Sequence, residues 1–147
     1  MGRIADVLGS KGHTVHTTGP SSTVFEAIEK MVSLNVGCLV VMDEAGEVRG
    51  IVTERDYLRK IALLGRSSRT TEVHEIMTSP VRCIGSDTTV EEAMAIMTEM
   101  RHRHLPIVNG GRLAGLASLG DLAKYLVRDQ KFQIEQLTNY IGGTYPG

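Results

Sequence analysis

Two segments of the chain place apolar residues three and four positions apart, which is the spacing of one helical face. In the first segment these positions are Val24, Ala27, Ile28, Met31 and Leu34. A shift of 66 residues brings each of them onto an apolar residue of the second segment, residues 90–100. The pattern predicts two amphipathic helices of the same design, one in each half of the chain.

Shorter apolar runs, separated by turn-forming residues, accompany each helix and predict strands. The strands are expected at residues 14–17, 37–42 and 47–52, and again at 81–84, 104–108 and 112–117. Further helical segments are expected at 4–8, 54–64 and 73–77. The last helix is expected to begin near Ser118 and to continue as far as Tyr140, before Gly142 and Gly143 end it. Each half therefore has the order strand, helix, strand, strand, helix.

The most specific repeated feature is a seven-residue motif where the last strand of each half becomes a helix. Residues 50–56 read GIVTERD and residues 115–121 read GLASLGD. Because an internal repeat dictates the fold, the two copies predict an α/β (α+β) protein. Two sheets, each with both helices on one face, would pack face to face. The expected boundaries are 3–66 and 67–128 for the repeats and 129–147 for a C-terminal helical extension.

The composition is that of an ordinary soluble domain, with 41% apolar and 22% charged residues. A net charge of −1 gives no general attraction to nucleic acid or to anionic membranes. No apolar run approaches the roughly 20 residues that span a bilayer, and no signal peptide is recognised. Cys38 and Cys83 lie in apolar runs and are interpreted as reduced core residues, which predicts a cytoplasmic location.

The doubled unit resembles a tandem pair of CBS domains, also called a Bateman module. The resemblance rests on Thr-Val-x-x-Ala at the start of each long helix and on the seven-residue motif, and it covers about residues 3–128. Segments 53–60, 103–108 and 137–143 resemble stand-alone two-CBS proteins of bacteria and plants. The resemblance implies a homodimeric energy or redox sensor that regulates an unidentified protein. It also implies a ligand such as AMP, ADP, ATP, NAD or S-adenosylmethionine in the cleft between repeats.

The motif itself offers the groups that such a ligand needs. Asp56 and Asp121 end the two copies, and a carboxylate accepts hydrogen bonds from both ribose hydroxyls. The hydroxyls of Thr53 and Ser118 lie at a helix start, where a phosphate is favoured. The same pattern also fits a helix capping box, and the residues could do both jobs.

Basic residues distinguish the two halves. Arg55 adds a phosphate-binding cation to the first motif, whereas Gly120 takes its place in the second, so two different clefts are expected. A run at the end of the second long helix has no basic counterpart in the first half; by resemblance it would bind phosphates through Arg101, His102, Arg103 and His104. A solvated helix end is the simpler alternative. A His-x-His metal site lacks an evident third ligand, so no metal is expected.

By resemblance, each cleft combines sugar-binding residues of one repeat with adenine-lining residues of the other. The first such group is Asp121 and Ser118 with Thr17, Val36 and Gly37. The second is Asp56 and Thr53 with Cys83, His102 and Arg103. The adenine is expected against apolar strand residues, as in most small-ligand pockets.

Other classes of function have less support. The five histidines are dispersed, neither cysteine has an activating base nearby in the sequence, and no P-loop or dinucleotide fingerprint occurs, so no enzymatic activity is expected. The main alternative is a protein-interaction scaffold that needs no ligand. Single-stranded nucleic acid is disfavoured because aromatic residues make up only 4% of the chain.

The helix faces favour a homodimer. Their apolar surface exceeds the apparent needs of one small core and is supplied by Ile61, Leu64, Met94, Met97 and Leu126. A further strip in the tail, made of Ile134, Leu137 and Ile141, could pack on the partner or on its own module.

Overall fold

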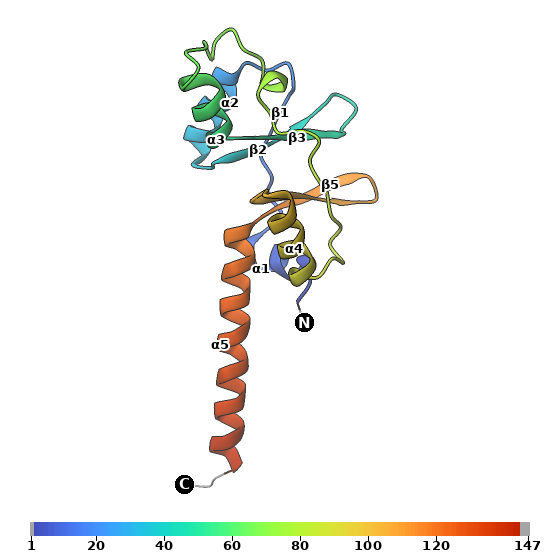
Figure 1. The fold of residues 1–147 in the computed structure, drawn as a ribbon. Helices are drawn as coiled ribbons and strands as arrows, with labels where there is room; N and C mark the ends of the chain where they lie inside the picture. The colour runs from blue at the N-terminus through green and yellow to red at the C-terminus, as the bar shows by residue number, and fades with distance from the viewer. Residues whose placement is uncertain (1, 145–147) are drawn as a thin grey trace.

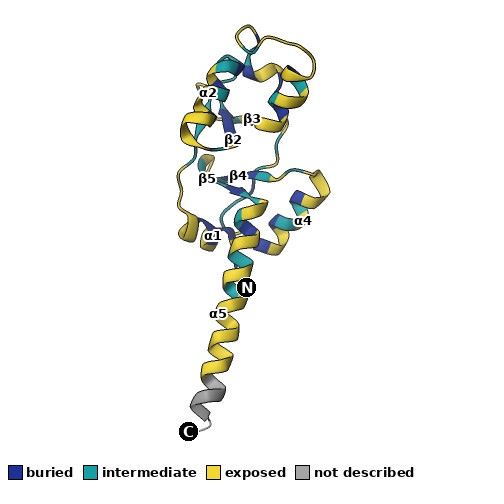
Figure 2. Ribbon diagram, turned by 90° about the vertical axis from the view of Figure 1, so that its left-hand side faces the viewer, coloured by how far each residue is buried: buried dark blue, intermediate teal, exposed yellow. Residues whose placement is uncertain are grey.

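The computed structural model describes the backbone of residues 2–144 and the side chains as far as residue 139 (Figure 1). Two units of sheet and helix lie one above the other, and a single long helix, α5, extends from the lower unit. The two strand-rich faces meet in the middle of the molecule in both ribbon views (Figures 1 and 2). The predicted fold class, a pseudo-symmetric pair of repeats packed sheet to sheet, is confirmed.

The first unit has a three-stranded sheet in the order β1 (Thr17–Thr18), β2 (Cys38–Met42), β3 (Val48–Thr53). β1 runs parallel to β2, and β2 runs antiparallel to β3. Helix α2 (Val24–Leu34) lies between β1 and β2 in the chain, and its N-cap Thr23 accepts a hydrogen bond from the Glu26 N–H at 3.1 Å. The last helix is split into α3 (Glu54–Tyr57) and the π-helical turn η1 (Leu58–Ala62).

The second unit repeats this plan with a smaller sheet. A 3₁₀ turn, η2 (Val73–Glu75), precedes α4 (Val90–Met100), the hairpin strands β4 (His104–Asn109) and β5 (Arg112–Ser118), and α5 (Leu119–Thr144). The predicted strand at 81–84 is reduced to one parallel bridge between Ile84 and Ile107. α5 continues to Thr144, so the prediction that Gly142 and Gly143 end the helix is wrong.

Each repeat has its own core, but the two repeats exchange their leading segments. Helix α1 (Ile4–Lys11) contributes Ile4, Val7 and Leu8 to the core of the second repeat. In return, Val73 and Ile76 complete the core of the first repeat. The predicted boundaries at 3–66 and 67–128 therefore stay a prediction for the sequence repeats, whereas each packed unit takes its first helical segment from the other half.

The glycines of the two motifs allow this exchange. A Cβ atom on Gly50 would lie 2.5 Å from the backbone oxygen of Thr78, which belongs to the segment that crosses β3. A Cβ atom on Gly115 would lie 2.8 Å from the nearest side-chain carbon of Leu8 in α1. Gly50 thus needs to lack a side chain because backbone lies directly on the strand there, whereas at Gly115 the neighbour is the end of a side chain that can move.

The outer part of α5 makes no contact that buries it. Its 26 residues correspond to a rod of about 39 Å at 1.5 Å per residue. From Gln130 to Asn139 every described side chain is exposed, which Figure 2 shows as a continuous yellow helix. Ile134 and Leu137 are exposed by 64% and 61%, and the side chain of Ile141 lies outside the described residues. The tail strip therefore does not pack on its own module in this structure.

The expected surplus of apolar helix surface is only partly present. Ile61 and Met97 are 2% and 3% exposed and belong to the repeat cores, and Met94 and Leu126 pack against the second core. The interpretation of Ile61 and Met97 as surplus surface is therefore wrong, whereas Met94 and Leu126 are only partly buried. Leu64, exposed by 67%, remains on the surface.

Candidate functional site

A cleft of about 230 Å³ opens between the two repeats. The first repeat contributes Val36 and Gly37, and the second contributes Ser118 and Asp121, so four of the five residues predicted for this cleft lie together. The rest of the lining is formed by Lys11, Thr14, Val15, His16, Cys38, His104 and Leu116. The cleft thus has apolar walls and a few polar groups, which is the usual composition of a small-ligand site.

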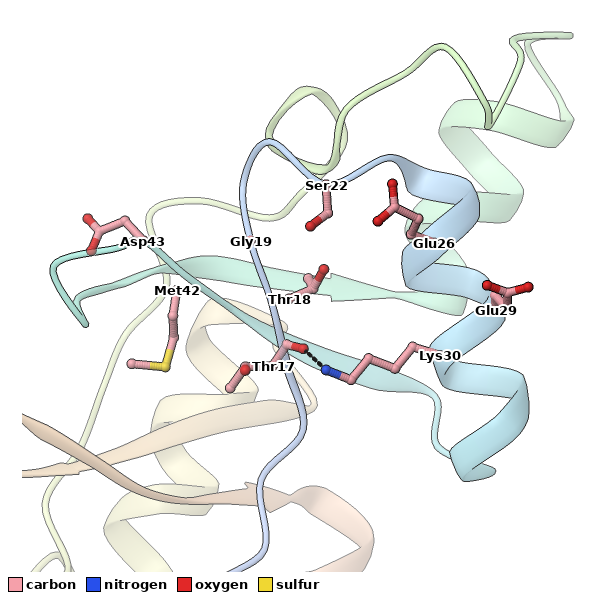
Figure 3. A pocket seen from close by; sticks show the side chains of 9 residues that line it. All are labelled: Thr17, Thr18, Gly19, Ser22, Glu26, Glu29, Lys30, Met42 and Asp43. Atoms are coloured by element: carbon pink, nitrogen blue, oxygen red, sulfur yellow. Dashed lines mark hydrogen bonds between the residues drawn. The ribbon is translucent and has the colours of Figure 1, made fainter.

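Thr17 is the residue of that predicted group that lies elsewhere. The strand β1 begins at Thr17 rather than ending there, so residues 14–16 face the cleft in its place. Thr17 lines a separate, open hollow of about 590 Å³ between β1 and α2, together with Glu26 and Lys30 (Figure 3). The Lys30 ammonium donates a hydrogen bond to the Thr17 carbonyl there.

Asp121 lies in the first turn of α5, at the edge of the cleft. The Ser118 N–H donates to Asp121 Oδ2 at 2.9 Å, and the Asp121 N–H donates to Ser118 Oγ at 3.0 Å, so the two residues form the predicted capping pair. The Lys11 ammonium also binds Oδ2, at 2.6 Å. Among the described residues no hydrogen bond reaches Oδ1, which leaves one carboxylate oxygen for a ligand.

Lys11 was missed by the sequence interpretation. It is the last residue of α1, and it donates hydrogen bonds both to Asp121 and to the Leu116 carbonyl at 2.7 Å. The contact joins residues 110 positions apart. Only the exchange of leading segments brings α1 to this cleft, and the repeat pattern contains no signal for that exchange.

The charges of the cleft are set by burial and by the Lys11 ion pair. Burial raises the pKa of the Asp121 carboxyl, but the hydrogen bonds from Lys11 and Ser118 outweigh this effect and hold it below its usual value. Burial lowers the pKa of His104, and the positive charges of Lys11 and Arg103 add to this, against the attraction of Asp121. At neutral pH the cleft therefore holds an ionised aspartate and an uncharged His104.

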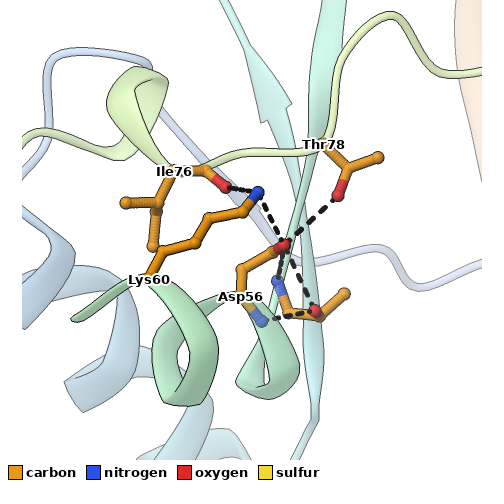
Figure 4. Close-up of polar contacts among 5 residues, drawn as sticks. Asp56, Lys60, Ile76 and Thr78 are labelled. Carbon is orange, nitrogen blue, oxygen red and sulfur yellow. Dashed lines mark hydrogen bonds and ion pairs between the residues drawn. The ribbon is translucent and has the colours of Figure 1, made fainter. Parts of the chain in front are cut away.

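Asp56, the counterpart of Asp121, has a different environment (Figure 4). It is only 7% exposed. The N–H and hydroxyl of Thr53 donate to Oδ2 at 3.0 and 3.1 Å, while Lys60 and the Thr78 hydroxyl donate to Oδ1 at 3.2 and 3.3 Å. Lys60 also donates to the Ile76 carbonyl at 2.7 Å. Both oxygens of Asp56 are therefore occupied within the chain, and Thr53 acts as the N-cap of α3.

Among the described residues, no hydrogen bond joins this network to Cys83, His102 or Arg103, the other residues predicted for the Asp56 cleft. Cys83 is partly buried, and burial raises the pKa of its thiol. Arg55 is exposed on α3. Cys38 lines the other cleft, and burial together with the charge of Asp56 raises the pKa of its thiol to about 12. Both cysteines are free thiols, and neither is activated as a nucleophile.

The residues of the basic run after α4 have different surroundings. Arg101 ends α4 in the left-handed conformation, with φ 55°. Arg101 and Arg103 are exposed, and the carbonyl of Arg103 accepts a hydrogen bond from the Leu119 N–H at 2.9 Å. His104 lines the Asp121 cleft, whereas His102 has a buried Nδ1 atom with no hydrogen-bond partner in the described part of the chain.

The next two observations concern metal binding and membrane spanning in the described part of the chain. Histidine, cysteine, aspartate and glutamate side chains do not gather in groups of three or more that would hold a metal ion. The described helices include none with the length and apolar character needed to cross a membrane.

Comparison with known proteins identifies the family. The sequence model of the CBS domain matches residues 7–63 and 73–128, which together make up most of the chain. The chain belongs to the CBS-domain family. It carries two CBS domains in tandem, and such pairs are regulatory modules.

Its relatives include stand-alone proteins of this family. The mitochondrial CBS domain-containing protein CBSX3 of Arabidopsis thaliana is 39% identical, over 97% of this chain and 73% of that protein. The CBS domain-containing protein YhcV of Bacillus subtilis is 34% identical, over 74% of this chain and 76% of that protein. Among solved structures, a putative signal-transduction protein with CBS domains from Burkholderia ambifaria is 44% identical, with a TM-score of 0.81, covering 87% of this chain and 96% of that one.

Proposed function

We propose that this CBS pair binds an adenosine nucleotide in the Asp121 cleft and acts as an energy or redox sensor. The observation that carries the proposal is the free Oδ1 of Asp121 at the edge of a cleft between the repeats. A carboxylate in this position accepts ribose hydroxyls, which distinguishes a nucleoside from an apolar ligand. AMP, ADP, ATP and NAD(H) all contain a ribose with these hydroxyls.

The walls of the cleft support the same ligand class. Val15, Val36 and Leu116 offer apolar surface for an adenine ring, close to the carboxylate that would hold its ribose. The Ser118 hydroxyl can donate to a phosphate at the start of α5, where the Leu119 and Asp121 N–H groups are already bonded to the Arg103 carbonyl and Ser118 Oγ. The cleft volume of about 230 Å³ suits one nucleoside, with phosphates extending toward the mouth.

The first prediction is that AMP, ADP, ATP or NAD(H) binds and that Asp121→Ala weakens this binding. The expected loss is about 1.5–3 kcal/mol, because a hydrogen bond to a charged group is removed. Calorimetry on both proteins measures it, and Glu135→Ala on the exposed part of α5 is a control that removes the same charge away from the cleft. An absence of heat for all four ligands at millimolar concentration would refute the proposed function.

A second candidate function is a protein-interaction scaffold that needs no ligand. The exposed apolar side chains of α5 favour it. Val127, Phe132, Ile134 and Leu137 expose 58–64% of their surface on α5. Large exposed apolar surface commonly marks an interaction site. Thermal unfolding distinguishes the candidates, since a specific ligand raises the midpoint by mass action and a pure scaffold shows no shift with nucleotide.

The second prediction is a homodimer, formed with or without ligand. Besides α5, the end of the first repeat exposes Leu58, Leu63 and Leu64 by 56%, 80% and 67%, and burial of such surface would stabilise a symmetric pair. Light scattering should give about twice the 16.0 kDa chain mass at micromolar concentration. Leu63→Glu with Leu64→Glu should shift the equilibrium toward monomer, and a monomer at high micromolar wild-type concentration would contradict the proposal.

We propose a cytoplasmic location, on the basis of two free cysteines, and a protein target that responds to occupancy of the cleft. No role in nucleic-acid binding, membrane binding or catalysis is part of this proposal.

A further inference from the structure

Lys11 introduces a positive charge into the Asp121 cleft from a helix outside the repeat motif. Its ammonium group donates to Asp121 Oδ2 at 2.6 Å and to the Leu116 carbonyl at 2.7 Å. The side chain is 32% exposed, and that of Asp121 is 23% exposed, so the pair lies in the open cleft rather than in the core. An ammonium has three N–H donors, and the recorded acceptors use two of them.

The third donor is available to a ligand without loss of either existing bond. A ribose whose hydroxyl donates to Asp121 Oδ1 brings its own phosphate into the cleft that Lys11 and Asp121 both line. Charge-assisted hydrogen bonds from lysine to phosphate are strong, whereas a neutral hydroxyl gains less from the charge. The position of Lys11 therefore favours an anionic oxygen on the ligand.

Charge balance leads to the same conclusion. Apart from histidines, Lys11 and Asp121 are the charged residues of the cleft lining, and together they cancel. Without the lysine, an unpaired carboxylate would face the phosphates of a nucleotide and repel them through a partly buried, weakly screened environment. An uncharged nucleoside would not experience this repulsion.

The ion pair is not needed to hold the helix start. Asp121 already caps α5 through the Ser118 N–H at 2.9 Å. In the first repeat, the equivalent aspartate binds Lys60 from its own helix, four residues along, and both carboxylate oxygens there are filled. Only at Asp121 do a lysine donor and a carboxylate oxygen remain available side by side.

We propose that Lys11 is the residue that makes the Asp121 cleft prefer phosphorylated adenosine ligands over adenosine. The inference rests on the proposed nucleotide-binding function and adds the residue that determines phosphate recognition. α1 thereby becomes a functional part of the second CBS domain, through its last residue, in addition to its packing role.

The third prediction tests this with Lys11→Met, which keeps the aliphatic stem and removes the charge. AMP affinity should fall roughly tenfold or more, because a charge-assisted contact is lost and the carboxylate is unmasked. Adenosine affinity should change by about twofold or less, since adenosine carries no phosphate to contact or repel. Lys131→Met on the exposed part of α5 removes the same charge far from the cleft and should bind both ligands as the wild type does.

Calorimetry with adenosine and AMP tests the role of Lys11 on the wild type, Lys11→Met and Lys131→Met. Thermal unfolding first shows that each of the three proteins is folded. Equal losses for both ligands, or an unchanged AMP affinity in Lys11→Met, would overturn the role of Lys11 while leaving nucleotide binding intact. If the wild type binds neither ligand, the proposed function fails, and the inference fails with it. An NMR titration of Asp121 in the absence of ligand gives a separate check of the contact: its pKa should be higher in Lys11→Met than in the wild type.

Discussion

Replacing Gly50 by alanine should destabilise the protein by about 3 kcal/mol, at the upper end of the usual cost of overpacking. The new Cβ atom would lie 2.5 Å from the Thr78 carbonyl oxygen, well inside van der Waals contact. That oxygen accepts a hydrogen bond from the Ile51 N–H at 3.1 Å, and the Thr78 N–H donates to the Ile51 carbonyl at 2.8 Å. The backbone therefore cannot move away without breaking both bonds of this bridge.

Two other glycines provide matched controls for this fourth prediction. At Gly115 the new Cβ atom would meet the end of the Leu8 side chain at 2.8 Å, and because that side chain can rotate, the cost should be smaller. Gly9 lies in α1 with nothing within 4 Å of the added atom, so Gly9→Ala should stabilise the helix by about 0.5–1 kcal/mol. Urea denaturation of the three variants should give this order. A Gly50→Ala protein of wild-type stability would show that the crossing segment is not held on the strand.

The repeat made the fold predictable, because two copies of one pattern had to bury the same faces. The helix at 24–34 and the hairpin strands were predicted nearly to the residue. The exchange of α1 and the 73–77 segment was not predicted, because it depends on which of two similar cores each segment packs against. Both segments are short and apolar on one face, so either core satisfies the pattern.

Errors in the site came from small shifts in register. The predicted strand at 14–17 is observed at Thr17–Thr18, so residues 14–16, which precede the strand, line the cleft, and Thr17 lines the separate hollow beside α2. Val36, Gly37, Ser118 and Asp121 line one cleft, as the sequence suggested, because they flank well-defined elements, and their ligand-binding roles stay a prediction. Lys11 could be found only from the structure, since its contact depends on the exchange.

The local chemistry of the two motifs could not be distinguished from the sequence either. Both were predicted to bind ribose, with helix capping as the alternative. The structure shows capping in both and leaves a free carboxylate oxygen only at Asp121. The difference arises from residues outside the motif: Lys60 and Thr78 beside Asp56, and Lys11 beside Asp121. A ribose at Asp56 would have to replace a bond from Lys60 or Thr78.

The fifth prediction follows from this difference. Asp56→Ala should lower the free energy of unfolding by about 2–3 kcal/mol, because it removes a nearly buried carboxylate and leaves the Thr53 N–H and the Thr78 hydroxyl without their acceptor. Lys60 is 41% exposed and can turn to water, which limits the cost. Asp121→Ala should lose only about 1 kcal/mol, mainly the helix cap, since its carboxylate is more exposed.

Urea denaturation and nucleotide calorimetry on both variants separate a structural aspartate from a ligand-binding one. We expect Asp56→Ala to be the less stable protein and Asp121→Ala to be the weaker binder. Asp56→Asn should recover part of the stability, because its amide oxygen can still accept the bond from the Thr53 N–H. Asp56→Ala could instead keep its stability and bind one nucleotide fewer than the wild type. In that case a ligand displaces the bonds from Lys60 and Thr78 at low cost. The first CBS domain would then also contribute a ribose-binding aspartate, and the module would hold two nucleotides.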